Sequence, residues 1–335
     1  MEAKETAIKK SMGSWKPNQH LSNLAVLWYE ESELATKRLF PVVEVDLPSG
    51  YYYEFSKGDL ARDNVGLKPT YGSVAPALFG IKDNTFNCKV YQVLIGIDKL
   101  MMKPYEREGI IGIERHHTKK AAEQLALHQE LDFASKFFKS GVWGNEWQGA
   151  TTANVAQKKF LKFDNEKADP IALMDSLSVG VKQVGRRRPN KLALGVETFA
   201  ALKNNPSVKE RIKYSGSQVN PAVVNENVLA QLFGVEQVVV CDATYNAAQY
   251  GTAEDMQFVC DSKGALLFYA PKEPRIDEPS AIYSFQWRLD NNNYIAIETH
   301  DLQDATHTLQ IEGLIAYDMK KTADDLGVYL SNCVG

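Results

Sequence analysis

Cysteine is scarce in this chain of 335 residues, and its four cysteines, Cys88, Cys241, Cys260 and Cys333, lie far apart. No two of them form a CxxC pair, so the spacing indicates neither a disulfide framework nor a zinc site of the usual closely spaced kind. The expected state is four reduced, buried thiols in a protein made in a cytoplasm.

Long hydrophobic runs and an excess of positive charge are also missing. No apolar stretch approaches the roughly 18 residues that a membrane span needs, and residues 1–5 (MEAKE) do not resemble the start of a signal peptide. Lysine and arginine total 38 and aspartate and glutamate 42, a net charge of −4 that argues against tight nucleic-acid binding. With 44% hydrophobic and 24% charged residues, the chain is expected to be globular, with about two domains for its length.

The linear motifs of common enzymes are absent as well. The sequence has no GxxxxGK[ST], GxGxxG, GxSxG or HExxH pattern, which argues against the common nucleotide-binding and hydrolase classes. His300, Asp301, Asp304 and His307 have the composition of a two-histidine, carboxylate metal site, but a polar loop between two strands is the favoured interpretation. Cys241 would act as a nucleophile only beside a histidine base, and a buried thiol after three valines is preferred.

Two further groups invite a functional interpretation and have a simpler one. Arg186, Arg187 and Arg188 could contact phosphate, although three charges in an acidic chain usually mark a solvated turn or a salt bridge to a neighbour. Trp143 and Trp147 could form a stacking platform for a sugar or a base, but their place just past a predicted helix makes core packing the better interpretation.

Residues 1–40 are predicted to form an arm. The stretch Leu21–Leu39 has the pattern of one short helix, with Leu24, Leu27 and Trp28 on one face. The arm contains too many aromatic and aliphatic residues for a free tail, so we expect it to dock on something, with a neighbouring subunit as one candidate.

Residues 41–97 are predicted to be β structure around a long excursion. Val42–Val45 and Tyr51–Phe55 have strand composition, and a further strand around Phe86 is expected to point Phe86, Cys88 and Val90 inward. Between them, residues 56–80 are rich in charge, glycine and proline. A structureless loop of that length in a compact domain usually serves function or binding.

Residues 112–140 carry the clearest helix pattern, predicted to end at Gly141 and to be roughly 40 Å long. Its apolar face is wide. One stripe comprises Leu127, Leu131, Ala134 and Phe138, and an adjacent one Ala122, Ala126, Phe133 and Phe137.

The rest of the chain is predicted to be mixed and then β-rich. Residues 170–245 have helices alternating with two short buried strands, and Asn225 and Gly234 are the expected caps of one helix. Residues 258–260 and 265–269 are expected to form a hairpin, and residues 282–335 alternate as strands do.

Several local stretches, in order, resemble one family. They are Leu39–Val43, Asp132–Phe138, Gly141–Gly144, Pro189–Gly195, Ala201–Pro206, Glu210–Tyr214, Leu232–Val235, Ala243–Asn246 and Asp325–Asn332. Together they resemble the major capsid proteins of tailed bacteriophages, the Hong Kong 97-type fold.

The resemblance implies an α+β capsid fold with five parts. These are an N-terminal arm (1–40), an extended β-hairpin loop with flanking strands (41–97), a peripheral domain with a long spine helix (98–185), an α/β axial domain (186–280) and return strands of the peripheral domain (281–335). It also implies a structural protein of the virion, assembled in the host cytoplasm into hexamers and pentamers of an icosahedral shell. The shell would enclose double-stranded DNA without sequence-specific binding, and no membrane is involved.

The resemblance further implies an assembly interface and no catalytic, cofactor-binding or metal-binding residue. The expected interface residues are Tyr51, Tyr53, Lys57, Asp59, Arg62, Asp63, Lys68, Arg186, Arg187 and Arg188. A separate scaffolding protein is expected, because the arm and loop leave no room for a fused scaffolding segment before the spine helix. A portal protein and a decoration protein are the other partners.

Two rival interpretations stay open at this point. An encapsulin-like cellular compartment would share the fold and hold cargo protein instead of DNA. A soluble α/β enzyme would be a compact monomer or small oligomer, which leaves the arm and the long loop unexplained.

Overall fold

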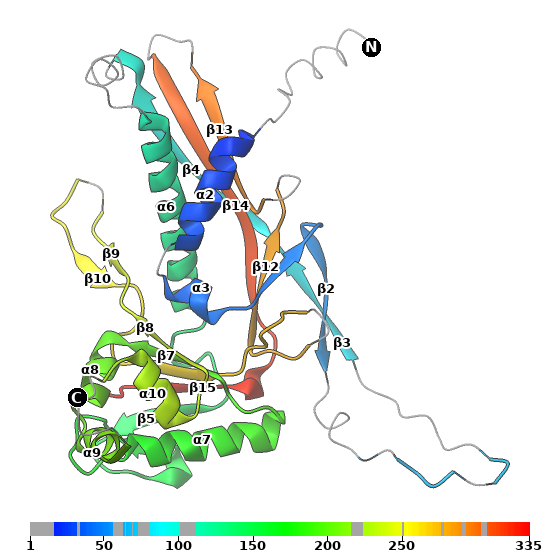
Figure 1. Cartoon of the computed structure of the whole chain (residues 1–335), viewed down its shortest axis with the longest axis vertical. Coiled ribbons are helices and arrows are strands. Elements are labelled where there is room, and N and C mark those ends of the chain that lie inside the picture. The colour runs from blue at the N-terminus through cyan, green and yellow to red at the C-terminus, as the bar shows by residue number, and fades with distance from the viewer. Residues whose placement is uncertain are drawn as a thin grey trace. The chain divides into compact units, whose positions relative to one another are not determined.

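The computed structural model describes residues 17–31, 34–55, 63, 65–68, 70–72, 81–100, 112–215, 224–249, 251–275, 278–289, 293–302 and 307–335. The chain divides into two compact units. Unit 1 draws on Met1–Ser32, Lys89–Ala126 and Trp287–Ala316, and unit 2 on Glu33–Cys88, Leu127–Gln286 and Tyr317–Gly335. Helix α6 (Ile113–Lys136) and strand β14 (Thr308–Lys321) contribute residues to both units (Figure 1).

Unit 1 is built on antiparallel strands with helices beside them. Its elements are α2 (Gln19–Glu31), β4 (Lys89–Asp98), β13 (Ile295–Asp301), the first half of α6 and the first half of β14. β13 pairs with β14 in antiparallel register from Ile295↔Ile315 to Asp301↔Leu309, and β4 also pairs with β14. A Cβ at Gly313 of β14 would lie 3.3 Å from Ala121, so α6 packs closely on this strand.

Helix α2 covers the free edge of β13. The backbone amide of Asn18 donates to the Ile297 carbonyl across 2.8 Å, and the Ser22 hydroxyl accepts from the Ile297 amide across 2.9 Å. An uncovered edge strand would offer these groups to another chain. The helix therefore removes an edge that would otherwise be free to pair.

The face of α2 that packs is not the predicted one. Leu21, Ala25 and Tyr29, spaced four residues apart, are buried, whereas Leu27 is 50% exposed. Ser22, which accepts from the Ile297 amide of β13, lies beside Leu21 and Ala25 on the helix, so this contact brings their side of the helix inward. The predicted single helix is also divided in two, because α3 (Ala35–Leu39) is a separate element.

Unit 2 holds most of the secondary structure. Its helices are α3 (Ala35–Leu39), the second half of α6, η1 (Val155–Gln157), α7 (Pro170–Gly185), α8 (Val196–Asn204), α9 (Pro206–Ser215), α10 (Glu226–Phe233) and η2 (Asp324–Leu326). Its first strands are β1 (Val42–Val45), β2 (Ser49–Phe55), β3 (Ile81–Asn87), β5 (Glu146–Ala150), β6 (Lys159–Leu161), β7 (Lys191–Gly195) and β8 (Gln237–Cys241). The others are β9 (Thr244–Asn246), β10 (Met256–Phe258), β11 (Ala265–Phe268), β12 (Ile282–Trp287), β15 (Gly327–Ser331) and the second half of β14.

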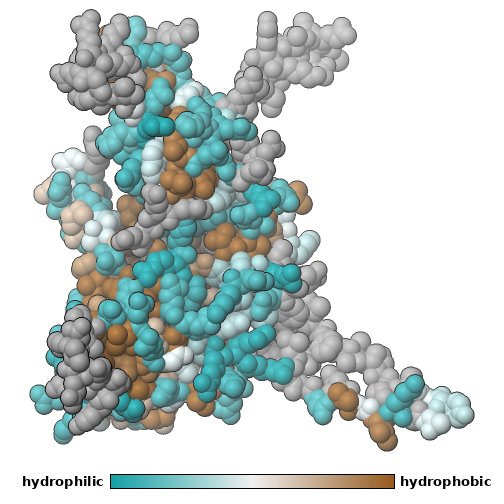
Figure 2. All heavy atoms as spheres, viewed as in Figure 1, coloured by the Kyte–Doolittle hydropathy of each residue, from teal (hydrophilic) through white to brown (hydrophobic). Residues whose placement is uncertain are grey.

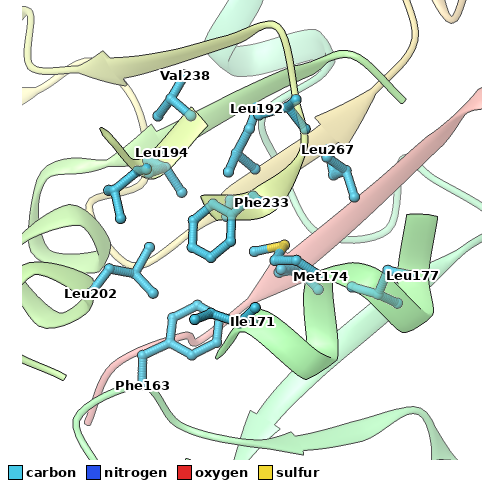
Figure 3. Close-up of a cluster of buried hydrophobic side chains, with 14 of the residues drawn as sticks. Phe163, Ile171, Met174, Leu177, Leu192, Leu194, Leu202, Phe233, Val238 and Leu267 are labelled. Carbon is cyan, nitrogen blue, oxygen red and sulfur yellow. The ribbon is translucent and has the colours of Figure 1, made fainter. Parts of the chain in front are cut away.

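A six-stranded mixed sheet in the order β6-β5-β15-β11-β7-β8 organises unit 2. β5 lies parallel to β6 and β15, β7 lies parallel to β8, and β11 runs antiparallel to both of its neighbours. Helix α7 packs on this sheet through Ile171, Met174 and Leu177, which meet Leu192 and Leu267 from the strands (Figure 3). This is the core of the unit.

The helices predicted between residues 170 and 245 are confirmed, because their start and stop signals are local. The Asn225 side chain accepts from the Val228 amide at the start of α10, and Gly234 ends it at φ 65°. Pro206 opens α9 at its first position.

The predicted hairpin of residues 258–260 and 265–269 is wrong. β11 lies between β7 and β15, with Ala265 opposite Leu194 on one side and Leu330 on the other. β10 pairs instead with β9. All four residues of β11 are buried, as a central strand requires, and the polar link before it only looks like a hairpin turn.

The long helix is confirmed, with a narrower core face than expected. α6 begins directly after Gly112 and ends at Lys136, four residues before residue 140, the last of the predicted helix. Ala122, Ala126, Phe133 and Phe137 are buried, whereas Leu127 and Leu131 are only half-buried. The second predicted stripe therefore provides the packing.

Two predicted strand patterns also differ. β12, between β1 and β14 in its sheet, is buried on both faces instead of alternating, because the Tyr52 and Phe86 rings of the β2–β3 hairpin cover Phe285 on one of these faces. Val90 of β4 is 50% exposed and does not point inward. Among the described helices, none has the length and apolarity to cross a bilayer.

Candidate assembly surfaces

The β2–β3 hairpin is the element that carries the predicted interface loop. Its strands pair in antiparallel register from Ser49↔Asn87 to Phe55↔Ile81, which confirms the predicted extended hairpin. The Phe86 ring stacks on Phe285 with centroids 4.5 Å apart, and Tyr52 lies 5.5 Å from the same ring. A Cβ at Gly50 would come within 2.8 Å of Phe86. The base of the hairpin is thus fixed to β12 by aromatic packing.

The structure describes only some of the predicted loop residues. Tyr51 is 68% exposed, on the hairpin face opposite Tyr52, and Asp63 and Lys68 are exposed. The Asp63 carboxylate accepts from the Val65 amide across 3.0 Å, a local turn contact. Lys57, Asp59, Arg62 and the side chain of Tyr53 lie outside the described residues.

Large apolar side chains in this loop were missed by sequence reasoning. Val65 is 90% exposed, Leu67 97% and Tyr71 105%, and Figure 2 shows hydrophobic side chains at the surface of this segment. Within the described part of unit 2, nothing covers them. The signal that could have found them is the presence of aliphatic and aromatic residues among the charges of the loop. Val65, Leu67 and Tyr71 are therefore available for contact with another molecule.

The three arginines lie together at the C-terminal end of α7. Arg186, Arg187 and Arg188 are exposed, and Arg186 adopts φ 59° as the cap of the helix. The Arg187 guanidinium lies 5.8 Å from the centroid of the Tyr269 ring. Cations are favourable at a helix C-terminus, so the run has a structural role as well as an exposed charge that a neighbour could use.

Short helix α3, between the arm and β1, is held at its start by a buried acid. The Thr36 amide donates to Glu130 of α6 across 2.8 Å, and the Thr36 hydroxyl donates to the same carboxylate oxygen. Burial raises the pKa of Glu130 to about 7, against the opposing effect of the Thr36 and Ala35 amides.

A half-buried lysine holds the other end of α3. The Lys191 Nζ donates to the carbonyls of Arg38 and Leu39, each across 2.9 Å. Burial lowers the pKa of Lys191 to about 8, and Glu236 opposes this shift. Arg38 in turn forms an ion pair of 2.9 Å with Glu226. Helix α3, which leads into β1 and the hairpin, is therefore held by side chains at both of its ends.

The predicted polar group near the end of β13 separates into pairs. His300 Nε2 lies 2.5 Å from the Glu312 carboxylate, and Asp301 pairs with Lys99. His307 is exposed beyond the strand, and Asp304 lies outside the described residues. The structure instead brings Glu298, His300 and Glu312 together, since Glu298 and Glu312 face each other across the strand pair.

The cysteines are buried and the tryptophans pack in the core, as the simpler interpretations of the sequence predicted. All four cysteines are buried and free of disulfides, and the pKa of Cys241 is raised by its contact with Cys260 and by burial. Trp143 is 4% exposed and its Nε1 donates to the Phe137 carbonyl across 2.8 Å. Trp147 packs against the core of unit 2.

Comparisons with known proteins agree on the kind of fold. The chain is 26% identical, over 257 residues, to the major capsid protein of Burkholderia phage BcepMu, a match that covers 75% of each chain. A scan against protein-family models finds no match. A phage-related protein from Bordetella bronchiseptica RB50 has a TM-score of 0.70 at 17% identity, covering 96% of this chain and 99% of that one.

A structure from a phage head gives the same result. The capsid structure of the cyanophage P-SCSP1u matches with a TM-score of 0.52 at 11% identity, covering 88% of this chain and 86% of that one. The α+β fold predicted from the sequence, that of tailed-phage capsid proteins, is confirmed. The similarity to a phage major capsid protein, together with this fold, supports a structural role in a capsid.

Proposed function

We propose that the chain is the major capsid subunit of a tailed-phage head, assembled into hexamers and pentamers of an icosahedral shell that encloses double-stranded DNA. The observation that carries the proposal is the β2–β3 hairpin. Its base is fixed by Phe86 on Phe285, while its loop presents Leu67 and its apolar neighbours without cover from the described part of unit 2. A side chain arranged in this way is ready to pack on a second copy of the chain.

The energetics of the loop suit a repeated contact. Fully burying one aliphatic side chain contributes roughly 1.5–3 kcal/mol, and an exposed ion pair made by a residue such as Lys68 contributes roughly 0–1 kcal/mol. Neither term alone gives a tight complex. A closed shell repeats the contact at each subunit, so that many weak contacts act together.

Enclosure of DNA is supported by the charge balance. A net charge of −4 gives the subunit little tendency to bind DNA tightly through its phosphates, so packaged DNA would be held by the closed shell. We propose a separate scaffolding protein, a portal and a decoration protein as partners, with assembly in the host cytoplasm and a final place in the virion.

The proposed division of labour follows the sequence segments. Residues 1–40 would act as the arm, 41–97 as the intersubunit loop, 98–185 with 281–335 as the peripheral domain, and 186–280 as the axial domain. Tyr51, Tyr53, Lys57, Asp59, Arg62, Asp63 and Lys68 would contact an adjacent subunit through the loop. Arg186, Arg187 and Arg188 would supply a second, basic contact.

Expression of the chain alone and together with its neighbouring genes tests the proposal. We expect closed shells in sedimentation and electron microscopy, and double-stranded DNA in particles recovered from a productive infection. A compact monomer under all of these conditions would contradict shell formation. Shells that hold a cargo enzyme and no DNA would instead identify an encapsulin-like compartment.

A further inference from the structure

Glu130, Cys241 and Cys260 form a buried side-chain cluster that the capsid role does not use. Glu130 comes from α6, Cys241 ends β8, and Cys260 follows β10. One donor atom from each of the three lies within 4.8 Å of the other two, and all three residues are buried. Three elements that are distant in sequence thus converge on one point inside unit 2.

One carboxylate oxygen of Glu130 lacks a hydrogen-bond partner among the described residues. The Oε2 atom accepts from Thr36, whereas Oε1 has no hydrogen-bond partner among the described residues and less than 1 Å² of exposed surface. Glu130 as a whole is 0% exposed. A buried carboxylate oxygen without a partner costs free energy, so a hydrogen-bond donor or a cation at this point would stabilise the fold.

The charges around the cluster point to a cation. The donor atoms beside the Glu130 carboxylate are the sulfurs of Cys241 and Cys260. Among the described residues, no lysine or arginine forms an ion pair with Glu130. The cluster therefore offers one unpartnered carboxylate oxygen and two thiols, and no lysine or arginine of the described residues pairs with the carboxylate.

We propose that Glu130, Cys241 and Cys260 bind a zinc ion inside the subunit, with Oε1 and the two sulfurs as ligands. Zinc accepts thiolate and carboxylate ligands at about 2.3 Å and 2.0–2.2 Å, which places neighbouring donor atoms about 3.5–4 Å apart in tetrahedral geometry. The observed limit of 4.8 Å needs only a small contraction. Thiolate softness favours zinc over magnesium or calcium.

A zinc ion at this point would join three parts of the subunit. It would tie the long helix to the end of β8 and to the segment after β10, while the other Glu130 oxygen holds Thr36 at the start of α3. Binding releases the thiol protons, so the affinity is expected to fall at acid pH. Tetrahedral zinc takes four ligands, so a water molecule would complete the site beside these three buried residues.

Metal analysis of the full chain tests the proposal. The protein is prepared without a histidine tag or chelator from cells grown with added zinc. We expect close to one zinc per subunit in the parent chain and in the control variants Cys88→Ser and Cys333→Ser, since these two thiols are buried outside the cluster. Zinc should be lost in Cys241→Ser and in Cys260→Ser, and reduced in Glu130→Gln.

A second measurement covers the case in which these variants fail to fold. The parent chain is stripped of metal by a chelator and titrated with cobalt(II), which should give the near-ultraviolet absorption of thiolate ligation and saturate at one ion per subunit. No zinc and no cobalt band in the parent chain would overturn the proposal. A Cys241–Cys260 disulfide in the native protein would also overturn it, because oxidised sulfurs cannot serve as thiolate ligands. Closed shells could form in any of these outcomes, so the capsid function is tested separately.

Discussion

The backbone amide of Thr36 donates a hydrogen bond of 2.8 Å to the buried carboxylate of Glu130. Thr36 lies in the first turn of α3, where helix amides have no partner within the helix, and Glu130 supplies one from α6. At the last turn, Lys191 donates to the carbonyls of Arg38 and Leu39. An acid and a base from two distant elements thus complete the hydrogen bonding of a five-residue helix that is too short to be stable alone.

Lys191→Met is expected to change how stability depends on pH. The pKa of Lys191 is about 8 in the folded protein, against an ordinary value of 10.5. Between these two pH values, the Lys191 amine is protonated in a larger fraction of unfolded chains than of folded chains. The free energy of unfolding therefore rises with pH across this window. The neutral amine still has two N–H groups for its two carbonyl partners. We expect the rise to be on the order of 1–2 kcal/mol after solvent screening, and the methionine variant to lack it.

Chemical denaturation of unassembled subunits at pH 7.5 and pH 10.5 measures this difference. The matched control is Lys167→Met, which removes an exposed lysine and should leave the pH dependence as in the parent. If the free energy of unfolding changed equally between the two pH values in the parent and in Lys191→Met, Lys191 would have the same pKa in the folded and unfolded chain.

Sequence reasoning succeeded where structure depends on neighbours along the chain. The cap residues Asn225 and Gly234 set α10 by local contacts, and the pattern of 112–140 predicted α6. It failed for β11, because nothing local shows that Ala265 lies between Leu194 and Leu330.

The candidate sites were also predictable only where they depend on residues close in the sequence. The hairpin that carries the loop was predictable, whereas the exposure of Leu67 needed the structure. Glu130 is four residues after Ala126 and three before Phe133, so helical spacing already placed it on the buried face of α6. Its meeting with Cys241 and Cys260 could not be predicted, because the three residues come from separate elements.

The face of α6 that packs can be tested by truncation. Phe133 is 0% exposed and its ring lies 5.0 Å from that of Phe40, so Phe133→Ala should cost about 3–5 kcal/mol. Leu131, predicted from the sequence as a core position, is half-buried, and Leu131→Ala should cost less. Glu123→Gln on the exposed face should stay within about 0.5 kcal/mol. Thermal unfolding of the three variants gives the order, and a larger loss for Leu131→Ala than for Phe133→Ala would reverse the assignment of the faces.

Two glycines offer a matched test of close packing. A Cβ at Gly195 would lie 2.3 Å from the carbonyl oxygen of Asp261 and 2.4 Å from that of Ser262, and backbone atoms cannot rotate away. Gly195→Ala should therefore destabilise the subunit, by about 1–3 kcal/mol as overpacking does. Gly180, inside α7, has open space at its Cβ, so Gly180→Ala should stabilise by about 0.5–1 kcal/mol. Thermal melts that shift in the same direction for both variants would contradict this picture.

The loop of the β2–β3 hairpin is expected to make apolar and charged contacts, and the two kinds can be distinguished by how assembly depends on salt. Leu67→Ser should leave the subunit folded, because the side chain is 97% exposed, and should weaken shell assembly. Apolar burial is not screened by ions, so this loss should persist at high salt. The double change Arg62→Glu with Lys68→Glu should weaken shells most at low salt, since the Debye length shortens from about 30 Å at 0.01 M to about 10 Å at 0.1 M. Circular dichroism checks folding and light scattering follows assembly across a salt series. Parent-like assembly of Leu67→Ser at every salt concentration would show that the exposed apolar residue of the loop does not contact a neighbouring subunit.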